Sequence, residues 1–257
     1  MGLHFGFADH NTHNHTEALI NQYKYVIEKG NIKKEMKILD AGCGVGGASL
    51  YIAKKCSADL VGVSIVNEQV EEARRNAIKA KLDKNVKFLV RDYANTGFAS
   101  NTFDVVFGME SICYAVSKEA FLKEAYRLLK PGGKLVITDG YRRRETTDKV
   151  EKQLMKDFCA GWSLYDLVGV DQMTEDIKSS GFKKIVVEDM TKQITMSLDR
   201  MRRLVWWWNI GEILLGWIQS PIVESARDNA KAMKNWINGV DDGLFGYFAH
   251  VAVKPKK

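Results

Sequence analysis

The fold of this chain is decided by the stretch Ile38-Leu39-Asp40-Ala41-Gly42-Cys43-Gly44-Val45-Gly46-Gly47. The apolar residues at its start predict a short strand over residues 37–40, and the residues from Ala48 to Lys55 predict a helix. Glycines between a strand and a helix let the backbone turn tightly and approach a ligand closely, and the helix N-terminus offers unpaired N–H groups. The stretch therefore predicts a ligand-binding loop, with a glycine-rich structural turn as the alternative.

Strand-like and helix-like segments alternate on either side of this loop. Further strands are predicted at residues 59–63, 86–90, 103–107 and 134–138, and helices at residues 68–80 and 118–129. Such alternation produces βαβ units, in which helices cover a mostly parallel sheet. We therefore expect a doubly wound α/β fold, with ligands bound beyond the carboxyl ends of the strands.

The second half of the chain is less regular. A helix is predicted over residues 171–180 and strands over residues 184–188 and 245–253, with an insertion of about residues 190–243 between the two strands. We interpret residues 1–30 as an N-terminal lid segment. Residues 31–257 are interpreted as one domain that carries the insertion as a helical cap.

Length and composition exclude several classes of protein. The chain has 257 residues, 46% of them hydrophobic, and a formal net charge of +6. These values indicate a globular protein with one sizeable core, and no block of Lys and Arg is dense enough to indicate nucleic acid as a partner. The four cysteines are too scattered for a disulfide framework or a structural zinc site.

The sequence indicates a cytoplasmic protein. Its N-terminus lacks the basic start and unbroken apolar run of a signal peptide. The longest apolar stretch, Leu204 to Ile218, is interrupted by Asn209 and Glu212 and is too short to span a bilayer. Contact with a membrane surface and assembly into a homo-oligomer both stay open.

The glycine spacing fits two kinds of cofactor loop. Gly42, Gly44 and Gly47 match the G-x-G-x-x-G pattern of dinucleotide-binding proteins, whereas Gly42, Gly44 and Gly46 match the G-x-G-x-G turn that cradles S-adenosylmethionine. A nicotinamide site needs an acidic residue at the end of the second strand, about 20 residues further on. This chain has no carboxylate over residues 62–65, which favours the second pattern.

Polar residues after the second and third strands fit the same interpretation. Ser64 and Gln69 can supply neutral hydrogen bonds to a ligand. Asp92 follows the third strand and can accept a hydrogen bond from an adenine amino group. The alternative for Asp92 is a carboxylate that caps a turn or a helix.

These stretches together resemble the class I S-adenosylmethionine-dependent methyltransferases. The resemblance is close over about residues 36–140 and rests on residues 38–47, Arg91-Asp92, Phe103-Asp104-Val105-Val106 and Leu128-Leu129-Lys130-Pro131-Gly132-Gly133. It implies a seven-stranded sheet with a reversed last strand, and S-adenosylmethionine as the cofactor, with S-adenosylhomocysteine as its product. The cofactor-binding residues that we predict on this basis are Phe5, Asp40, Gly42, Cys43, Gly44, Gly46, Ser64, Ile65, Gln69, Asp92, Tyr93 and Met109.

Two further segments resemble a narrower group of methyltransferases. The run Gly62-Val63-Ser64-Ile65-Val66-Asn67-Glu68-Gln69 is similar to the Gly-Val-Thr-Leu-Ser-x-x-Gln run of sterol, tocopherol and cyclopropane fatty acid methyltransferases. It departs from that run because Ser64 stands where Thr is commoner and Asn67 stands in place of Ser. His4-Phe5-Gly6-Phe7 resembles the His-Tyr-Gly-Phe element of sterol and related methyltransferases, which implies that it folds over the cofactor.

A candidate catalytic carboxylate, Glu110, follows the fourth strand. The segment Glu110-Ser111-Ile112-Cys113-Tyr114-Ala115 is similar to the Glu-Ala-x-Cys-His-Ala segment of sterol side-chain methyltransferases and to the Glu-Ser-x-x-Tyr segment of prenyl diphosphate C-methyltransferases. This resemblance implies catalytic roles for Glu110 and Tyr114. Those enzymes methylate an alkene and leave a carbocation, whose charge a buried carboxylate can oppose and whose proton it can accept. The alternative for Glu110 is a structural carboxylate that pairs with an Arg or with backbone N–H groups.

The insertion fits an apolar acceptor. Three consecutive Trp residues, 206–208, cannot share one helix face, so at least one of them is expected to face a pocket, a partner or a membrane. We predict that Trp206 and Trp207 bind substrate, with packing on the sheet as the alternative for much of the insertion. Arg142 is a candidate for binding a diphosphate on a prenyl substrate, although a solvated surface also explains it. His13 is a candidate substrate contact in the lid. No metal site in the protein is predicted, and Mg²⁺ is expected only if a diphosphate substrate holds it through its oxygens.

We therefore expect an enzyme that transfers a methyl group from S-adenosylmethionine to an alkene carbon of an isoprenoid. The acceptor is a small apolar or prenyl molecule: a prenyl diphosphate, a sterol-like or a tocopherol-like compound. Three alternatives stay open. They are N- or O-methylation of a small polar metabolite, cyclopropane formation on lipid acyl chains, and a non-catalytic binding module on the same fold.

Overall fold

The computed structural model describes residues 4–215 and 221–256, with the side chains of residues 212–215, 221–223 and 225 left undescribed. Over these residues seven strands form one sheet in the order β3-β2-β1-β4-β5-β7-β6. Their bounds are Lys37–Ala41 (β1), Asp59–Ser64 (β2), Val86–Val90 (β3), Phe103–Met109 (β4), Leu129–Arg142 (β5), Lys183–Asp189 (β6) and Phe245–Val253 (β7). Strands β1 to β5 pair in parallel, and β7 is antiparallel to both β5 and β6. The predicted seven-stranded sheet with a reversed last strand is confirmed.

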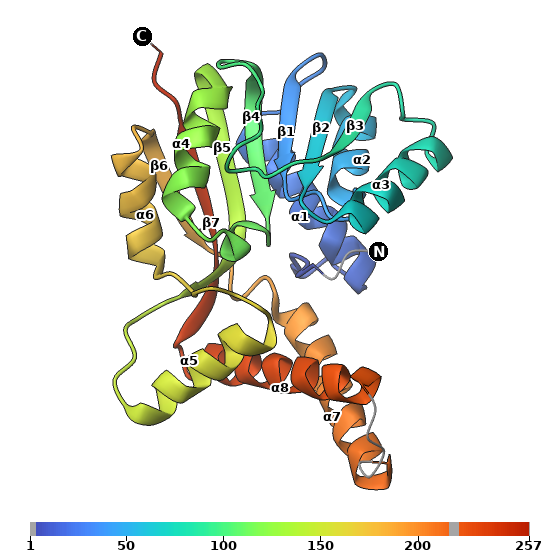
Figure 1. Cartoon of the computed structure of the whole chain (residues 1–257), viewed down its shortest axis with the longest axis vertical. Helices are drawn as coiled ribbons and strands as arrows, with labels where there is room; N and C mark the ends of the chain where they lie inside the picture. The colour runs from blue at the N-terminus through green and yellow to red at the C-terminus, as the bar shows by residue number, and fades with distance from the viewer. Residues whose placement is uncertain (1–3, 216–220, 257) are drawn as a thin grey trace.

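Helices cover both faces of this sheet (Figure 1). Their bounds are His15–Gly30 (α1), Gly47–Cys56 (α2) and Asn67–Lys79 (α3) for one face, and Lys118–Leu128 (α4) and Val170–Ser179 (α6) for the other. The first group contributes Val26, Ile52 and Ala73 to one buried core, and the second contributes Phe121 and Ile177 to another. Burial of apolar side chains on both faces of one sheet is the arrangement expected for a doubly wound α/β fold.

Helix α1 occupies a large part of the segment that the sequence suggested as a lid. Asn14 caps it by accepting a hydrogen bond from the backbone N–H of Glu17, and Ala18 and Val26 are fully buried. Helix α1 therefore packs into the core, and among the described residues the segment 4–14 stays a candidate for the predicted lid.

Three more helices lie beyond the carboxyl ends of the core strands (Figure 1). They are α5 (Lys149–Gly161), α7 (Thr195–Leu215) and α8 (Pro221–Asp241). Trp236 of α8 joins them to β7, because its ring lies 5.3 Å from the ring of Phe158 in α5 and 5.6 Å from that of Phe245. Helices α7 and α8 fall within the predicted insertion, whereas α5 was not predicted. The end of the apolar stretch 204–218 lies outside the described residues.

Strand β5 extends beyond its predicted bounds at both ends. At its start Gly132, with φ +82°, donates a backbone hydrogen bond of 2.8 Å to Lys254. At its end it pairs with the beginning of β7, where Arg142 lies opposite Phe245. This extension carries Asp139 and Tyr141 past the other strands, toward the helices that lie beyond the sheet.

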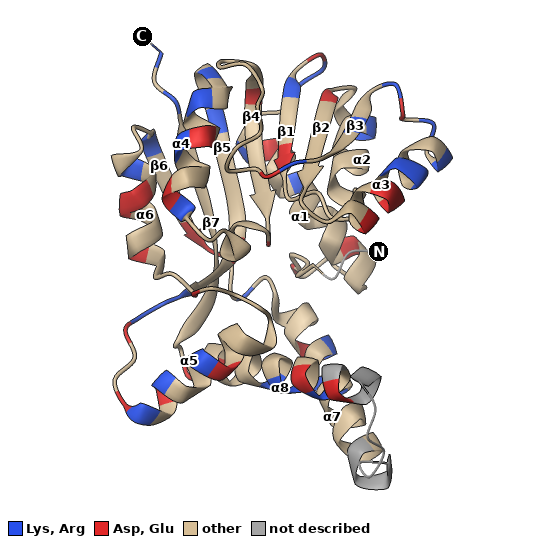
Figure 2. Cartoon of the chain, viewed as in Figure 1, with Lys and Arg blue, Asp and Glu red and all other residues tan. Residues whose placement is uncertain are grey.

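The described part of the chain contains no helix that is both long and apolar enough to cross a membrane. Figure 2 shows Lys and Arg beside Asp and Glu on α3, α4, α5 and α6. Charges of both signs are therefore interspersed on these helices.

Candidate functional site

The glycine loop joins β1 to α2 in the way that its sequence predicts. Gly42, Gly44 and Gly46 all have positive φ, at +110°, +50° and +86°. A Cβ atom on Gly42 would lie 2.2 Å from the Cβ of Ser111, and one on Gly46 would lie 2.6 Å from the ring of Phe88. Gly44 differs, because no protein atom lies within 4 Å of the place where its Cβ would be. The loop therefore leaves open space above Gly44, as a site for a bound cofactor requires.

Asp40 lies inside the protein just before this loop. It is 3% exposed, and its Oδ2 accepts a hydrogen bond of 2.6 Å from Ser49 Oγ in α2. Burial raises the pKa of Asp40 to about 7, although the Ser49 hydrogen bond and the charge of His4 oppose this change. The hydrogen bond between Asp40 and Ser49 therefore links β1 to α2 across the glycine loop. Cys43, also in the loop, is buried as well.

Asp40→Asn is expected to change how stability depends on pH. The folded state binds more protons than the unfolded state between pH 3.8 and about 7, so the Asp40 contribution to the free energy of unfolding falls as pH rises through this window. Relative to Asp40→Asn, wild type should lose up to about 4 kcal/mol between pH 4 and pH 8. Urea unfolding at both pH values measures this difference. Equal pH dependence of the two proteins would contradict it.

The ends of β2 and β3 offer the surface that an adenosyl group needs. Ser64 Oγ donates a hydrogen bond of 3.0 Å to Gln69 Oε1, so the structure brings these two predicted residues together. Ile65 beside them is 72% exposed, so its side chain is accessible to a ligand bound at this edge. Asp92 is exposed and accepts a hydrogen bond of 2.7 Å from the backbone N–H of Ala94, as a turn-capping carboxylate does. These residues fit S-adenosylmethionine, with neutral polar atoms, an apolar patch and one carboxylate along one edge.

Two other predicted cofactor residues lie on the inner side of this edge. Tyr93 donates a hydrogen bond of 3.0 Å from its hydroxyl to the carbonyl of Ser111. Met109, the last residue of β4, is buried opposite Thr138 of β5. Together they fix the start of the segment that carries Glu110.

Glu110 combines an unusual backbone conformation with several hydrogen bonds to its carboxylate. Its backbone has φ +51°, a left-handed conformation that residues other than glycine seldom adopt. Its Oε1 accepts hydrogen bonds from the backbone N–H of Phe5 (2.9 Å), the hydroxyl of Tyr247 (2.9 Å) and the amide of Gln22 (3.4 Å). Its Oε2 lies 3.5 Å from Nδ1 of His4, and the side chain is only 13% exposed. Glu110 therefore faces the interior of the site rather than bulk water, and its strained backbone is a typical feature of functional sites.

The segment His4-Phe5-Gly6-Phe7 is fastened over the end of the sheet. Phe5 and Phe7 are buried, and the ring centroid of each lies within 6 Å of the ring centroid of Tyr247. The N–H of Gly6 donates a hydrogen bond of 2.9 Å to Ser197 Oγ in α7. A Cβ on Gly6 would lie 2.5 Å from Ala18, so only glycine allows this close approach to α1.

Asp139 is a site residue that the sequence reasoning missed. It lies on the extension of β5, 2% exposed, and its Oδ2 accepts a hydrogen bond of 2.9 Å from the backbone N–H of Cys113. Burial raises the pKa of Asp139 to about 6, opposed by its hydrogen bonds with Cys113 and assisted by the charge of Glu110. Its position after a predicted strand was the available signal. Tyr247 and Gln22 gave no such signal, because their contacts depend on how β7 and α1 pack.

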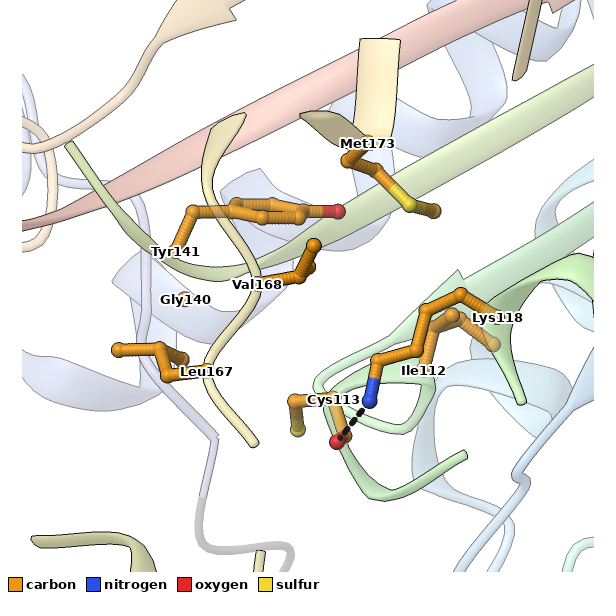
Figure 3. Close-up of a pocket in the computed structure, with 8 residues that line it drawn as sticks. All are labelled: Ile112, Cys113, Lys118, Gly140, Tyr141, Leu167, Val168 and Met173. Atoms are coloured by element: carbon orange, nitrogen blue, oxygen red, sulfur yellow. Dashed lines mark hydrogen bonds between the residues drawn. The ribbon is translucent and has the colours of Figure 1, made fainter. Parts of the chain in front are cut away.

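Residues that follow Glu110 in the chain help to line a narrow apolar crevice (Figure 3). It lies between the short 3₁₀ helix η1 (Ile112–Tyr114), the extension of β5 and the loop before α6, and it is too narrow in the described structure to admit a water molecule. Its lining residues are Ile112, Cys113, Lys118, Gly140, Tyr141, Leu167, Val168 and Met173. Lys118 is tied to the carbonyl of Cys113 by a hydrogen bond of 2.9 Å, and the buried hydroxyl of Tyr141 has no hydrogen-bond partner among the described residues.

Several residues predicted from the sequence have no described contact with Glu110, whereas the negative charge of Glu110 acts on the phenol of Tyr114. Tyr114 is half-exposed on η1. Trp206 and Trp207 are 57% and 63% exposed on α7, and their rings pack against each other at 4.7 Å. His13 precedes α1 in an exposed turn, and Arg142 pairs with Glu145 at 2.5 Å. Their catalytic and substrate-binding roles stay predictions. Within the described ranges, no group of three or more His, Cys, Asp or Glu is arranged to hold a metal ion.

A family model described as "Methyltransferase domain" matches residues 32–199 of the chain. The chain belongs to this methyltransferase family. The identification made from the motifs of residues 36–140, a class I S-adenosylmethionine-dependent methyltransferase, is confirmed.

Two relatives of this methyltransferase are similarly close in sequence. Phosphoethanolamine N-methyltransferase 1 of Arabidopsis thaliana is 33% identical over 177 residues, which cover 69% of this chain and 35% of that protein. A sterol 24-C-methyltransferase of Neurospora crassa is 31% identical over 204 residues, which cover 77% of this chain and 51% of that protein. This methyltransferase therefore spans about a third to a half of the length of these relatives.

A solved structure supports the same family. Phosphoethanolamine N-methyltransferase 2 of Haemonchus contortus, in complex with S-adenosyl-L-methionine, matches the methyltransferase with a TM-score of 0.75 at 25% identity. The match covers 92% of this chain and 53% of that chain.

Proposed function

We propose that this protein transfers a methyl group from S-adenosylmethionine to an alkene carbon of an isoprenoid, with Glu110 as the base. The observation that carries the proposal is the position of Glu110. Its carboxylate follows β4, is 13% exposed, and is held by three hydrogen-bond donors on one oxygen.

The residues at the ends of β1, β2 and β3 would hold the cofactor. The open space above Gly44 would receive part of it, and Ile65 would cover an apolar face of it. When bound, the cofactor supplies a methyl group activated by a sulfonium. Because this donor is already reactive, the protein contributes mainly alignment of the acceptor and exclusion of water.

Glu110 would act on the acceptor in two ways. Methylation of an alkene leaves a positive charge on carbon, and a fixed carboxylate stabilises such a charge more when water is excluded. The hydrogens next to that charge are strongly acidic, so even a carboxylate that accepts several hydrogen bonds is basic enough to remove one. A carboxylate held by Phe5, Tyr247 and Gln22 is suited to both roles.

The surroundings of Glu110 favour an uncharged apolar acceptor. Tyr247 donates a hydrogen bond to Glu110, and the buried rings of Phe5 and Phe7 pack against the ring of Tyr247. The basic run after β5 is already paired, since Arg142, Arg143 and Arg144 make ion pairs with Glu145, Asp189 and Glu151. An uncharged sterol-like or tocopherol-like isoprenoid therefore fits better than a prenyl diphosphate. Mg²⁺ would enter only with a diphosphate.

N-methylation of a phosphorylated amine is the second candidate. The observation that favours it is the relative named phosphoethanolamine N-methyltransferase, which is as close in sequence as the sterol 24-C-methyltransferase. In this case Glu110 would hold the ammonium group of the acceptor by charge, and the phosphate would need a cationic partner.

Methyl transfer from isotope-labelled S-adenosylmethionine tests the proposal. Purified protein would be offered uncharged isoprenoid alkenes, prenyl diphosphates with and without Mg²⁺, phosphoethanolamine, and phospholipids with unsaturated acyl chains, with mass spectrometry of the products. We expect label in an uncharged isoprenoid that keeps a double bond. Label found only in phosphoethanolamine would overturn the isoprenoid assignment. Label in a cyclopropane ring on an acyl chain would also overturn it, because the reaction would then end in ring closure instead of deprotonation.

A further inference from the structure

The two oxygens of Glu110 have different surroundings. Oε1 accepts all three hydrogen bonds described above, from Phe5, Tyr247 and Gln22. The one polar partner described for Oε2 is Nδ1 of His4, at 3.5 Å. Oε1 is therefore the anchored oxygen, and Oε2 is the one available for proton transfer.

His4 connects this oxygen to solvent. Its side chain is 25% exposed, about twice the 13% of Glu110. The backbone next to it is fixed, because the N–H of Phe5 donates to Oε1 and the N–H of Gly6 donates to Ser197. The same segment thus holds one oxygen of the carboxylate and places an imidazole next to the other.

We propose that His4 relays the proton that Glu110 removes from the acceptor to bulk water. This inference depends on one feature of the proposed function, which is that the acceptor loses a proton when it is methylated. It holds equally for an alkene and for an amine acceptor. In both, the methyl group arrives without its bonding electron pair, so the acceptor must release one proton for each methyl group gained.

The steps of the relay balance as follows. With an alkene acceptor a C–H bond of the methylated cation breaks, and with an amine acceptor an N–H bond of the ammonium group breaks before methyl transfer. In both cases the electron pair stays on the acceptor and the proton goes to Oε2 of Glu110. Neutral His4 then takes this proton at Nδ1, which restores the carboxylate. The imidazolium finally releases its Nε2 proton to water, which leaves neutral His4 protonated at Nδ1. Exchange with water then returns the proton to Nε2, so that Nδ1 is free to accept again in the next turnover.

The groups around His4 set the pH at which the relay works. Burial lowers the pKa of His4, but its hydrogen bond to Glu110 and the negative charges of Glu110, Asp40 and Asp139 outweigh this effect, so the net pKa is raised above 6.5. The phenols of Tyr23 in α1 and Tyr247 in β7 also lie near Glu110 and carry no charge at neutral pH, since burial raises the pKa of each. Only neutral His4 can accept the proton. Turnover should therefore rise with pH through the raised pKa of His4.

His4→Ala tests the relay, with His10→Ala as the matched control. His10 lies in the same N-terminal segment, is exposed, and interacts with its neighbours Asp9 and Asn11. We expect His4→Ala to lower kcat by about 10²-fold, to remove the rising limb of the pH profile and to regain activity with added imidazole. Affinity for S-adenosylhomocysteine should stay within about twofold in both variants, and His10→Ala should keep the wild-type profile.

A titration independent of turnover provides the second readout. We expect the NMR-monitored pKa of His4 to fall in Glu110→Gln, because the neighbouring negative charge is lost. Unchanged titration would overturn the relay, as would a His4→Ala enzyme that keeps the wild-type pH profile and gains nothing from imidazole. These results differ from failure of the proposed function, in which wild-type protein would methylate none of the acceptors although the pKa of His4 still falls in Glu110→Gln.

Discussion

Glu110→Gln is expected to lower methyl transfer by at least about 10³-fold while affinity for S-adenosylhomocysteine stays nearly unchanged. The substitution preserves the size of the side chain. Its amide oxygen can still accept the hydrogen bonds from Phe5, Tyr247 and Gln22, and its NH₂ group would face His4. What it removes is the negative charge and the ability to take a proton, so the loss should fall on kcat.

Glu119→Gln provides the control for this substitution. Glu119 lies on α4, is 69% exposed and pairs only with Lys123 at 2.6 Å in the described structure. Initial rates and calorimetric binding of S-adenosylhomocysteine, measured for both variants, separate a chemical role from a structural one. Wild-type turnover in Glu110→Gln would remove Glu110 as the base. A parallel loss of cofactor affinity would make it a structural carboxylate.

Gly44→Ala is expected to weaken cofactor binding by at least tenfold with little effect on folding. No protein atom lies within 4 Å of the added Cβ, so the cost to stability is limited to the positive φ of +50°, about 1 kcal/mol. If the open space above Gly44 belongs to the cofactor, the methyl group would clash with it. Calorimetric binding of S-adenosylhomocysteine and urea unfolding measure the two effects separately.

Two other glycines serve as comparisons for this substitution. Gly97 has a similar φ of +70°, and the nearest atom to an added Cβ is Arg91 Nη1 at 3.5 Å, so Gly97→Ala should lose the same stability but no cofactor affinity. Gly42→Ala should instead damage the fold, because its Cβ would lie 2.2 Å from Ser111. Wild-type binding of S-adenosylhomocysteine by Gly44→Ala would show that the cofactor lies elsewhere.

The parts of the site that could be predicted from the sequence are those fixed by neighbouring residues. The loop of Gly42 to Gly46 and the pair Ser64–Gln69 each lie within a few residues of a strand end, so strand and helix patterns place them. Glu110 was predicted from the resemblance of residues 110–115 to segments of other methyltransferases and from its place after the fourth strand. Local sequence thus determines the edge of the sheet where the cofactor is expected.

The contacts that hold Glu110 could not be predicted, because they join distant parts of the chain. Tyr247 reaches Glu110 only through the long antiparallel pairing of β5 with β7, and Gln22 only through the packing of α1. Strand β7 was predicted, as was an N-terminal segment that includes α1. The register of β7 against β5 and the packing of α1 on the sheet were not predicted. Asp139 was missed for a related reason, since β5 was predicted to end one residue before it.

The tryptophans of α7 show the limit of a helix-face argument. Three consecutive Trp residues indeed cannot share one face, and Trp206 and Trp207 are both more than half exposed. Helix geometry alone does not determine which surface each Trp side chain contacts. In the structure they pack against each other at 4.7 Å rather than on the residues around Glu110.

The central claim is that Glu110 faces the methyl group of a cofactor bound over the glycine loop. A crystal structure of the protein with S-adenosylhomocysteine tests it most directly. We predict that the ligand occupies the space above Gly44, with its sulfur on the Glu110 side and no protein atom between that sulfur and Oε2. A ligand bound away from Gly44, or a Glu110 side chain turned from the sulfur toward solvent, would contradict the account.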